Sequence, residues 1–185
     1  MFRFALTAAV LSLTAVSVQA DDVTDALSSA IEAYQDGDIK YALEELEYAK
    51  QLLKSMKTDE LVLFLPEAPD GWTREVNTEM NASLTMMGGG TGAEAEYSKS
   101  GAESFKITFM ADNPMVGAMS GLLGNAAVIG AKIERVGRQK FMVQDGELTG
   151  LVDSRILVKA SGGDTETMLE TLKMIDFKAL ADFGR

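Results

Sequence analysis

The feature that most constrains the fold is a change in the spacing of apolar residues at the segment LPEAPDGW, residues 65–72. Before this segment, apolar residues recur every three or four positions, as on one face of an α-helix. After it, they alternate with polar residues, as in β-strands with one buried face. Two of the three prolines of the chain, Pro66 and Pro69, lie in the segment and oppose regular structure there. The pattern predicts a helical part followed by a sheet part.

The helical part divides into two segments at Asp36-Gly37-Asp38. Gly37 can adopt the left-handed conformation that ends a helix, and Asp38 can cap the helix that follows. Apolar residues lie at helical spacing on both sides of this turn: Val23, Ala26, Leu27, Ala30, Ile31 and Tyr34 before it, and Ala42, Leu43, Leu46, Ala49, Leu53 and Met56 after it. We therefore predict an antiparallel helix pair over residues 21–58.

This helix pair resembles a single tetratricopeptide-type repeat, in which small alanines lie where the two helices approach closely. The matching positions are Ala26, Ala30, Tyr34, Gly37-Asp38, Ala42-Leu43, Leu46 and Ala49. The match departs from the family pattern at Ser29 and at Lys54, and an ordinary helical hairpin would also fit. Solenoids need three or more repeats to bury a continuous core. The resemblance thus implies contact with the rest of the chain or with another protein, and Tyr34, Tyr41 and Tyr48 are candidate partner contacts.

Residues 59–73 are expected to form a linker, and residues 74–185 a second domain of strands and helices. Alternation predicts strands around 80–86, 93–97 and 105–109, and four more between 132 and 160, joined by turns at 137–138, 145–146 and 153–154. Helices are expected at 114–130 and after Asp164, which can cap the last one. The predicted fold class is α+β, with a helix pair followed by a mostly antiparallel sheet covered on one face by helices.

Two wider resemblances concern the second part of the chain and the chain that follows residue 20. The order of elements in the second part, with LPEAPDGW as lead-in, is weakly similar to the PsbP-like sandwich. The whole chain after residue 20 also resembles a group of uncharacterised exported proteobacterial proteins, in which an NPM segment precedes a K.ER.G.QK strand and a terminal IDF..L; here these begin at Asn113, Lys132 and Ile175. Neither resemblance implies an activity.

Residues 1–20 have the pattern of a secretory signal peptide. Arg3 precedes an apolar stretch over residues 4–16, and Val18-Gln19-Ala20 offers small residues for cleavage after Ala20. An uncleaved membrane anchor is the alternative. We predict export to the periplasm, or less favourably to the medium. The formal net charge of −11 would be repelled by phosphate backbones, so nucleic acid is not expected as a partner.

The stretch from Asn113 to Ala131 contains no charged residue. Its length approaches that of a membrane span, about 20 apolar residues, but its glycines, Ser120 and Asn125 lower its hydrophobicity. The favoured interpretation is a helix packed across the sheet of the same protein. A helix that moves out to contact lipid or a partner, and a stable membrane span, are the two alternatives.

The residue types present exclude several kinds of chemistry. The chain has no histidine and no cysteine, which removes Ser-His-Asp and Cys-His catalysis and His- or Cys-based metal sites. Glu94 and Glu96, joined by Glu79, could be imagined as paired acids of a hydrolase, but a solvated sheet face is the simpler interpretation. The GGGTG segment at 88–92 lacks the lysine of a phosphate-binding loop.

Methionine is the one unusual feature, because the chain contains eleven of them. Soft thioethers can hold Cu(I), and methionine-lined surfaces also adapt to apolar ligands and peptides. We predict a groove beside the helix at 114–130, lined by Met80, Met86, Met87, Met115, Met119, Gly117 and Gly121. The predicted function is a non-catalytic periplasmic adaptor, without cofactor, that engages another exported protein through the hairpin and this groove. The alternative is a carrier of a small apolar ligand or Cu(I).

Overall fold

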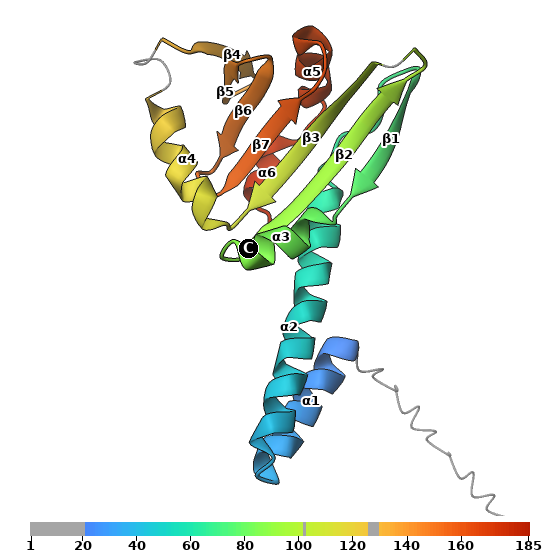
Figure 1. Cartoon of the computed structure of the whole chain (residues 1–185), viewed down its shortest axis with the longest axis vertical. Helices are drawn as coiled ribbons and strands as arrows, with labels where there is room; N and C mark the ends of the chain where they lie inside the picture. The colour runs from blue at the N-terminus through green and yellow to red at the C-terminus, as the bar shows by residue number, and fades with distance from the viewer. Residues whose placement is uncertain (1–20, 102, 126–129) are drawn as a thin grey trace, which may run out of the picture. The chain divides into compact units, whose positions relative to one another are not determined.

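The computed structural model describes residues 21–101, 103–125 and 130–185, in two compact units. The hairpin unit ends at Leu52, and the sheet unit runs from Leu53 to Arg185. The elements in chain order are α1 (Asp22–Gln35), α2 (Ile39–Val62), β1 (Trp72–Asn77), α3 (Met80–Met86), β2 (Thr91–Lys99), β3 (Glu103–Ala111), α4 (Pro114–Gly124), β4 (Lys132–Val136), β5 (Gln139–Gln144), β6 (Glu147–Val152), β7 (Ile156–Ser161), α5 (Thr165–Leu172) and α6 (Phe177–Ala181) (Figure 1). The predicted α+β class is confirmed.

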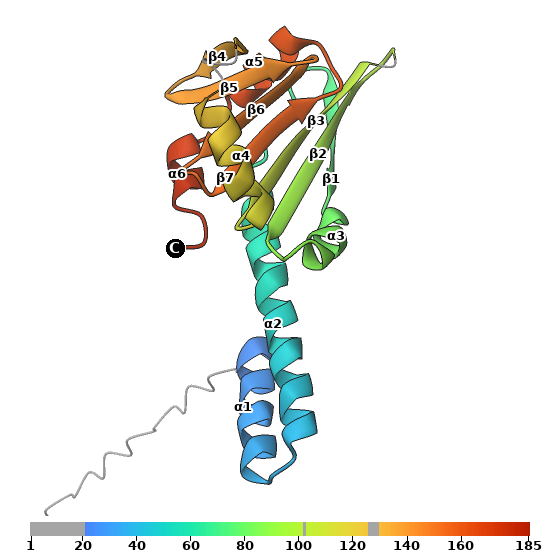
Figure 2. The ribbon, with the colours of Figure 1, turned by 60° about the vertical axis from the view of Figure 1, so that its left-hand side comes forward.

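The turn between the two hairpin helices forms as the sequence predicts, and the start of α1 is capped as well. The Asp21 side chain accepts a hydrogen bond from the Thr24 backbone N–H at 2.8 Å and caps α1. Gly37 adopts a φ of 84° after that helix. Asp38 then accepts the Tyr41 backbone N–H at 3.0 Å and caps α2. α1 and α2 lie side by side and antiparallel (Figures 1 and 2), and α2 continues to Val62, so the first residues of the expected linker are helical.

The sheet unit contains one seven-stranded sheet in the order β1-β2-β3-β7-β6-β5-β4, and every neighbouring pair is antiparallel. The turns between β5 and β6 and between β6 and β7 have two consecutive residues at positive φ, Asp145-Gly146 and Asp153-Ser154. This conformation matches the twist of paired strands and fixes their register. α4 lies near β6 (Figure 2), while side chains of α5 and α6 complete the core on one face of the sheet.

The core continues into the segment that precedes β1. Phe105 of β3 stacks on Tyr97 of β2 with ring centroids 4.7 Å apart, and it meets Trp72 edge-on at 5.1 Å. The Tyr97 hydroxyl donates a hydrogen bond of 2.6 Å to the Pro66 carbonyl. Burial raises the pKa of Tyr97, although the nearby Arg74 charge lowers it in part. This contact anchors the proline-rich segment to the sheet.

The strand predicted around 80–86 is wrong, because this segment is helix α3. The Asn77 side chain accepts the Glu79 backbone N–H at 2.7 Å and starts the turn. Asn81 then bonds both the backbone N–H and the carbonyl of Gly92 at 2.7 Å, which fixes the helix against β2. Leu84 is buried there. Met80 and Leu84 are four residues apart, so the same residues satisfy a helical pattern.

Candidate functional site

Alanines form the interface between the two hairpin helices. The buried residues of this unit are Ala26, Ala30, Ala33, Ala42 and Ala49. Small side chains let two helices approach closely, but they leave the larger apolar residues beside them outside the contact. The resemblance to a tetratricopeptide-type repeat predicts alanines at this helix crossing.

The larger apolar side chains lie in two exposed stripes. Leu27, Ile31 and Tyr34 of α1 share one stripe, because they are four and three residues apart. Ile39, Leu43 and Leu46 of α2 have the same spacing. Their exposed fractions run from 40% for Leu27 to 69% for Tyr34. We call these six residues the hairpin face.

Both stripes belong to the same side of the hairpin. Each lies on the same rotational side of its own alanine row, since successive residues turn by about 100° around the helix axis. Leu27 follows Ala26, and Leu43 follows Ala42. Two antiparallel helices are related by a two-fold axis normal to the plane that contains both helix axes. Rotation about this axis does not exchange the two sides of the plane. Stripes that are offset in the same sense from their alanine rows therefore lie on the same side of it. The hairpin face is therefore a single apolar surface.

The surroundings of the hairpin face are strongly acidic. Residues 21–52 contain nine acidic and two basic residues. Both basic side chains are paired inside the unit, Lys40 with Glu44 at 3.6 Å and Lys50 with Glu47 at 3.0 Å. A partner surface would therefore meet apolar side chains bordered by uncompensated negative charge.

The three tyrosines predicted as partner contacts are all exposed but do not share one surface. Tyr34 belongs to the hairpin face. Tyr41 and Tyr48, seven residues apart on α2, lie on the other side of its alanine row. A hydrogen bond to Glu45 and the charge of that carboxylate raise the pKa of Tyr41. Only Tyr34 therefore joins the apolar stripe, and the contact roles of all three stay predictions.

The residues of the predicted methionine groove differ widely in exposure. Met80 packs toward Gly92, Met86 is 90% exposed, and Met87 and Met115 are about half exposed. Met119 is half-buried. The end of α3 does approach the start of α4, because Asn113 donates a hydrogen bond to the Gly89 carbonyl. Whether these methionines bind a peptide, an apolar ligand or Cu(I) stays a prediction.

α4 packs less tightly than the sequence predicts. Val116 is buried, but Gly117 and Gly121 are exposed, with open space where a Cβ would lie. No backbone approaches these two glycines within the described residues. The helix ends at Gly124, and the predicted helical residues 126–129 lie outside the described ranges.

Of the three carboxylates singled out in the sequence, Glu94 and Glu96 belong to a charge ladder on the sheet, whereas Glu79 lies at the start of α3. Lys106 Nζ lies 3.0 Å from a Glu94 oxygen and 3.6 Å from a Glu96 oxygen. Thr108 Oγ1 donates to Glu94 at 3.0 Å. The hydrogen bond and charge of Glu94 raise the pKa of Lys106. Within the described residues, no three acidic side chains gather as they would around a metal ion.

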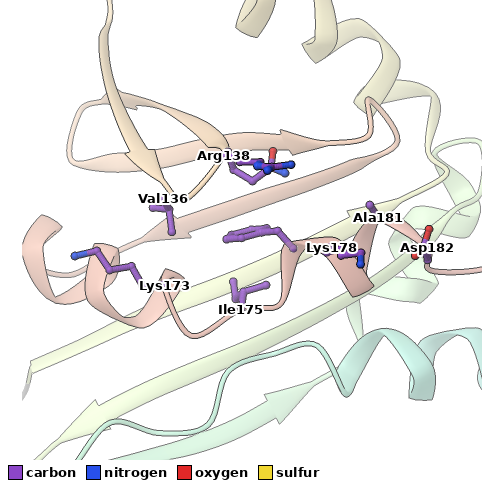
Figure 3. A pocket seen from close by; sticks show the side chains of 10 residues that line it. Val136, Arg138, Lys173, Ile175, Lys178, Ala181 and Asp182 are labelled. Carbon is purple, nitrogen blue, oxygen red and sulfur yellow. The ribbon is translucent and has the colours of Figure 1, made fainter.

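A cavity of about 650 Å³ lies between the β4–β5 turn and the segment from the end of α5 through α6 (Figure 3). Val136 and Ile175 point toward each other inside it, and Arg138 and Lys178 are at its border. The apolar floor of the cavity consists of Val136, Ile175, Phe177 and Ala181. The cavity thus combines an apolar floor with basic side chains, in an acidic protein.

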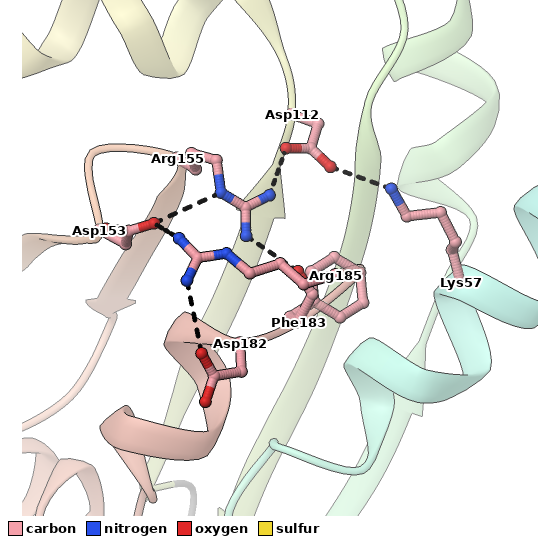
Figure 4. Close-up of polar contacts among 7 residues, drawn as sticks. All are labelled: Lys57, Asp112, Asp153, Arg155, Asp182, Phe183 and Arg185. Carbon is pink, nitrogen blue, oxygen red and sulfur yellow. Dashed lines mark hydrogen bonds and ion pairs between the residues drawn. The ribbon is translucent and has the colours of Figure 1, made fainter.

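An ion-pair network around Asp112 joins distant parts of the sheet unit (Figure 4). Asp112 accepts hydrogen bonds from Lys57 Nζ at 3.0 Å and from Arg155 Nη1 at 2.9 Å. Arg155 also donates to the Phe183 carbonyl at 2.9 Å and lies 3.6 Å from Asp153. These contacts tie α2, the end of β3 and the C-terminal segment together. Every charge is matched, which is typical of a structural cluster.

Replacing Asp112 with asparagine is expected to lower the free energy of unfolding by about 1 kcal/mol at pH 7, a value reduced for its exposure. The side chain is 34% exposed. Burial alone would raise the pKa of Asp112, but the hydrogen bonds and charges of Lys57 and Arg155 outweigh it and lower the pKa. Asparagine tolerates the φ of 55° at this position.

The pH dependence follows from the lowered pKa of Asp112. The stabilisation is fully present above pH 3.8, the ordinary pKa of aspartate in the unfolded chain. It is lost as the pH falls through the lower pKa of Asp112 in the folded protein. Urea unfolding at pH 7, 5 and 3 should show the difference between wild type and Asp112→Asn shrinking at the lowest pH. Asp145→Asn is the matched control, at a φ of 51°. A difference that stayed constant with pH would contradict this explanation.

Within the described residues, no helix has both the length and the apolar character needed to cross a membrane. Comparisons of the chain with models of protein families, with curated proteins and with solved structures give no match. The resemblances to a tetratricopeptide-type repeat, to the PsbP-like sandwich and to exported proteobacterial proteins therefore stay predictions.

Proposed function

We propose that the protein is a non-catalytic, exported adaptor that binds another exported protein through the hairpin face. The observation that supports this most is the exposure of six large apolar side chains in two stripes, which helical spacing places on one side of the two-helix unit. Isolated exposed apolar residues are common on protein surfaces, but contiguous ones indicate an interaction site. Export rests on the signal-peptide pattern of residues 1–20.

The size of the hairpin face fits a modest protein interface. Six leucine- or tyrosine-sized side chains about half exposed amount to roughly 600 Å², close to the ~800 Å² that each partner contributes to a standard interface. Tyr34 is the most exposed of the six, and tyrosine is over-represented among the residues that dominate binding energy. Two exposed apolar stripes side by side suit the apolar face of an amphipathic helix from a partner.

The charge of the unit narrows the class of partner. The lysines at 40 and 50 are already paired, so the remaining carboxylates favour a partner whose apolar stripe is bordered by lysine or arginine. A second copy of the hairpin would bring two acidic surfaces together, which is unfavourable. Binding should therefore weaken as ionic strength rises.

The test uses the processed chain as bait for exported proteins, with wild type and four single variants compared side by side. Wild type should recover a partner protein. Leu43→Glu should recover at least tenfold less of it, because the new charge would be buried against an apolar surface. Gln51→Glu is the matched control, since it adds the same charge at an exposed position of α2 away from the hairpin face. Glutamate is a good helix former, so far-UV circular dichroism should be unchanged in both.

Three results bear on the proposal in different ways. The proposal is supported if the partner is lost with Leu43→Glu and retained with Gln51→Glu. If the partner is also lost with Ile31→Glu, α1 belongs to the same interface. Equal recovery by all baits would overturn the role of the hairpin face. Loss with Tyr48→Ala but not with Leu43→Glu would move the interface to the opposite side of α2.

A further inference from the structure

The cavity between the β4–β5 turn and α6 has charges that the rest of the sheet unit does not neutralise. Lys173 is paired with Glu170, and the lining residue Asp182 lies 3.4 Å from Arg185, which also pairs with Asp153. Arg138 and Lys178 are exposed on its border, and within the described part of the chain neither takes part in an ion pair. Two uncompensated cations therefore border the same cavity in a chain with a formal net charge of −11.

The floor of the cavity is apolar and packs on the core of the sheet unit. Val136 and Ile175 are buried, and they face each other from β4 and from the segment after α5 (Figure 3). Phe177 packs on Phe141 of the core with ring centroids 6.0 Å apart. The volume of the cavity, about 650 Å³, lies inside the range of roughly 300–1,000 Å³ found for small-molecule sites. The cavity is therefore large enough for a short apolar chain.

We propose that this cavity binds a small organic anion that has an acidic head and an apolar tail, such as a medium-chain carboxylate. Arg138 offers a planar group that can hold a carboxylate through two hydrogen bonds, and Lys178 adds a second positive charge. The tail lies over Val136, Ile175, Phe177 and Ala181. The proposal is separate from the hairpin face and stands whether or not that surface binds a protein.

The two parts of the site predict different ligand preferences. A head without a tail, such as acetate, lacks the apolar contact. A tail without a charge, such as octanol, lacks the pairing with Arg138 and Lys178. Octanoate combines both and should bind at least tenfold more tightly than either one. Because the cavity is open to water, binding should weaken with salt.

The experiment is a titration of the processed chain with octanoate, acetate and octanol at low salt, followed by amide chemical shifts in nuclear magnetic resonance. Octanoate should shift residues around 136–139 and 175–182 in a saturable manner. Arg138→Gln should weaken octanoate about fivefold, and Arg138→Gln combined with Lys178→Gln more than tenfold. Ala181→Leu should also weaken it, because the added side chain occupies part of the floor.

Lys140→Gln is the matched control, because Lys140 is exposed on β5 and alternates away from Gln139, which lines the cavity. It removes the same charge and should change octanoate binding less than twofold. Octanol binding as tightly as octanoate would overturn the role of the cations. Acetate binding as tightly would overturn the role of the floor. An equal loss with Lys140→Gln would mean that only the overall charge matters, and the proposed site would be wrong.

Discussion

Replacing Phe105 with alanine is expected to lower the free energy of unfolding of the sheet unit by about 4 kcal/mol, the middle of the range for large-to-small core changes. Phe105 is 1% exposed and contacts both Tyr97 and Trp72. Its removal loses apolar burial, leaves a cavity and breaks two aromatic contacts at once. Domains of this size are stable by only about 5–15 kcal/mol, so the variant should be close to its unfolding limit.

Urea unfolding followed by far-UV circular dichroism measures this change, since the fluorescence of Trp72 itself is altered by the loss of its neighbour. Phe105→Leu keeps most of the volume and should cost about 1 kcal/mol. Leu63→Ala, at an exposed position, should cost less than about 0.5 kcal/mol. A cost for Phe105→Ala below that of Phe105→Leu would contradict the packing described for this core.

The sequence predicts those parts of the fold that depend on local interactions. The helix caps at Asp38 and Asp164 and the turn at Asp145-Gly146 all form, because each depends on the conformational preference of a few neighbouring residues. The strands around 93–97 and 105–109 pair directly, with Tyr97 opposite Phe105. Alternation identifies them because one side of each strand is buried throughout its length.

Short apolar patterns fail where two periods fit the same residues. Met80, Ala82, Leu84 and Met86 alternate, yet the tertiary contacts of Asn81 and Leu84 with Gly92 select a helix. Seven residues are too few for the periodicity to decide. The packing of Gly92 against α3 could not be inferred from the sequence. The loop between α3 and β2 brings the two together, and its path depends on the folded sheet.

The candidate sites were only partly accessible to sequence reasoning. Both alanines and leucines lie at helical spacing in α1 and α2, but only the structure shows that alanines occupy the contact and leucines remain outside. The available signal was the regular placement of a large residue directly after Ala26, Ala30 and Ala33. The cavity with Arg138 was missed because its walls come from residues around 136–139 and 173–182, and no local pattern links them.

Gly150 illustrates a constraint that only the folded sheet reveals. It lies directly opposite Phe141 on β5. A Cβ at Gly150 would lie 2.9 Å from two Phe141 ring carbons and 3.0 Å from the Lys140 carbonyl oxygen. The ring is fully buried and packs on Phe177, so it has no free space into which it can move. The glycine is therefore needed for close approach of an aromatic ring to the neighbouring strand.

Gly150→Ala is accordingly expected to lower the free energy of unfolding by about 3 kcal/mol, the upper part of the range for overpacked cores. Gly121→Ala is the matched control, because a Cβ there meets nothing within 4 Å. In the interior of α4 it should raise helix stability by up to about 1 kcal/mol. Urea unfolding followed by Trp72 fluorescence reports both variants from a site remote from the change. Equal effects of the two substitutions would mean that Phe141 can yield to the added methyl group, and the described contact would then not be rigid.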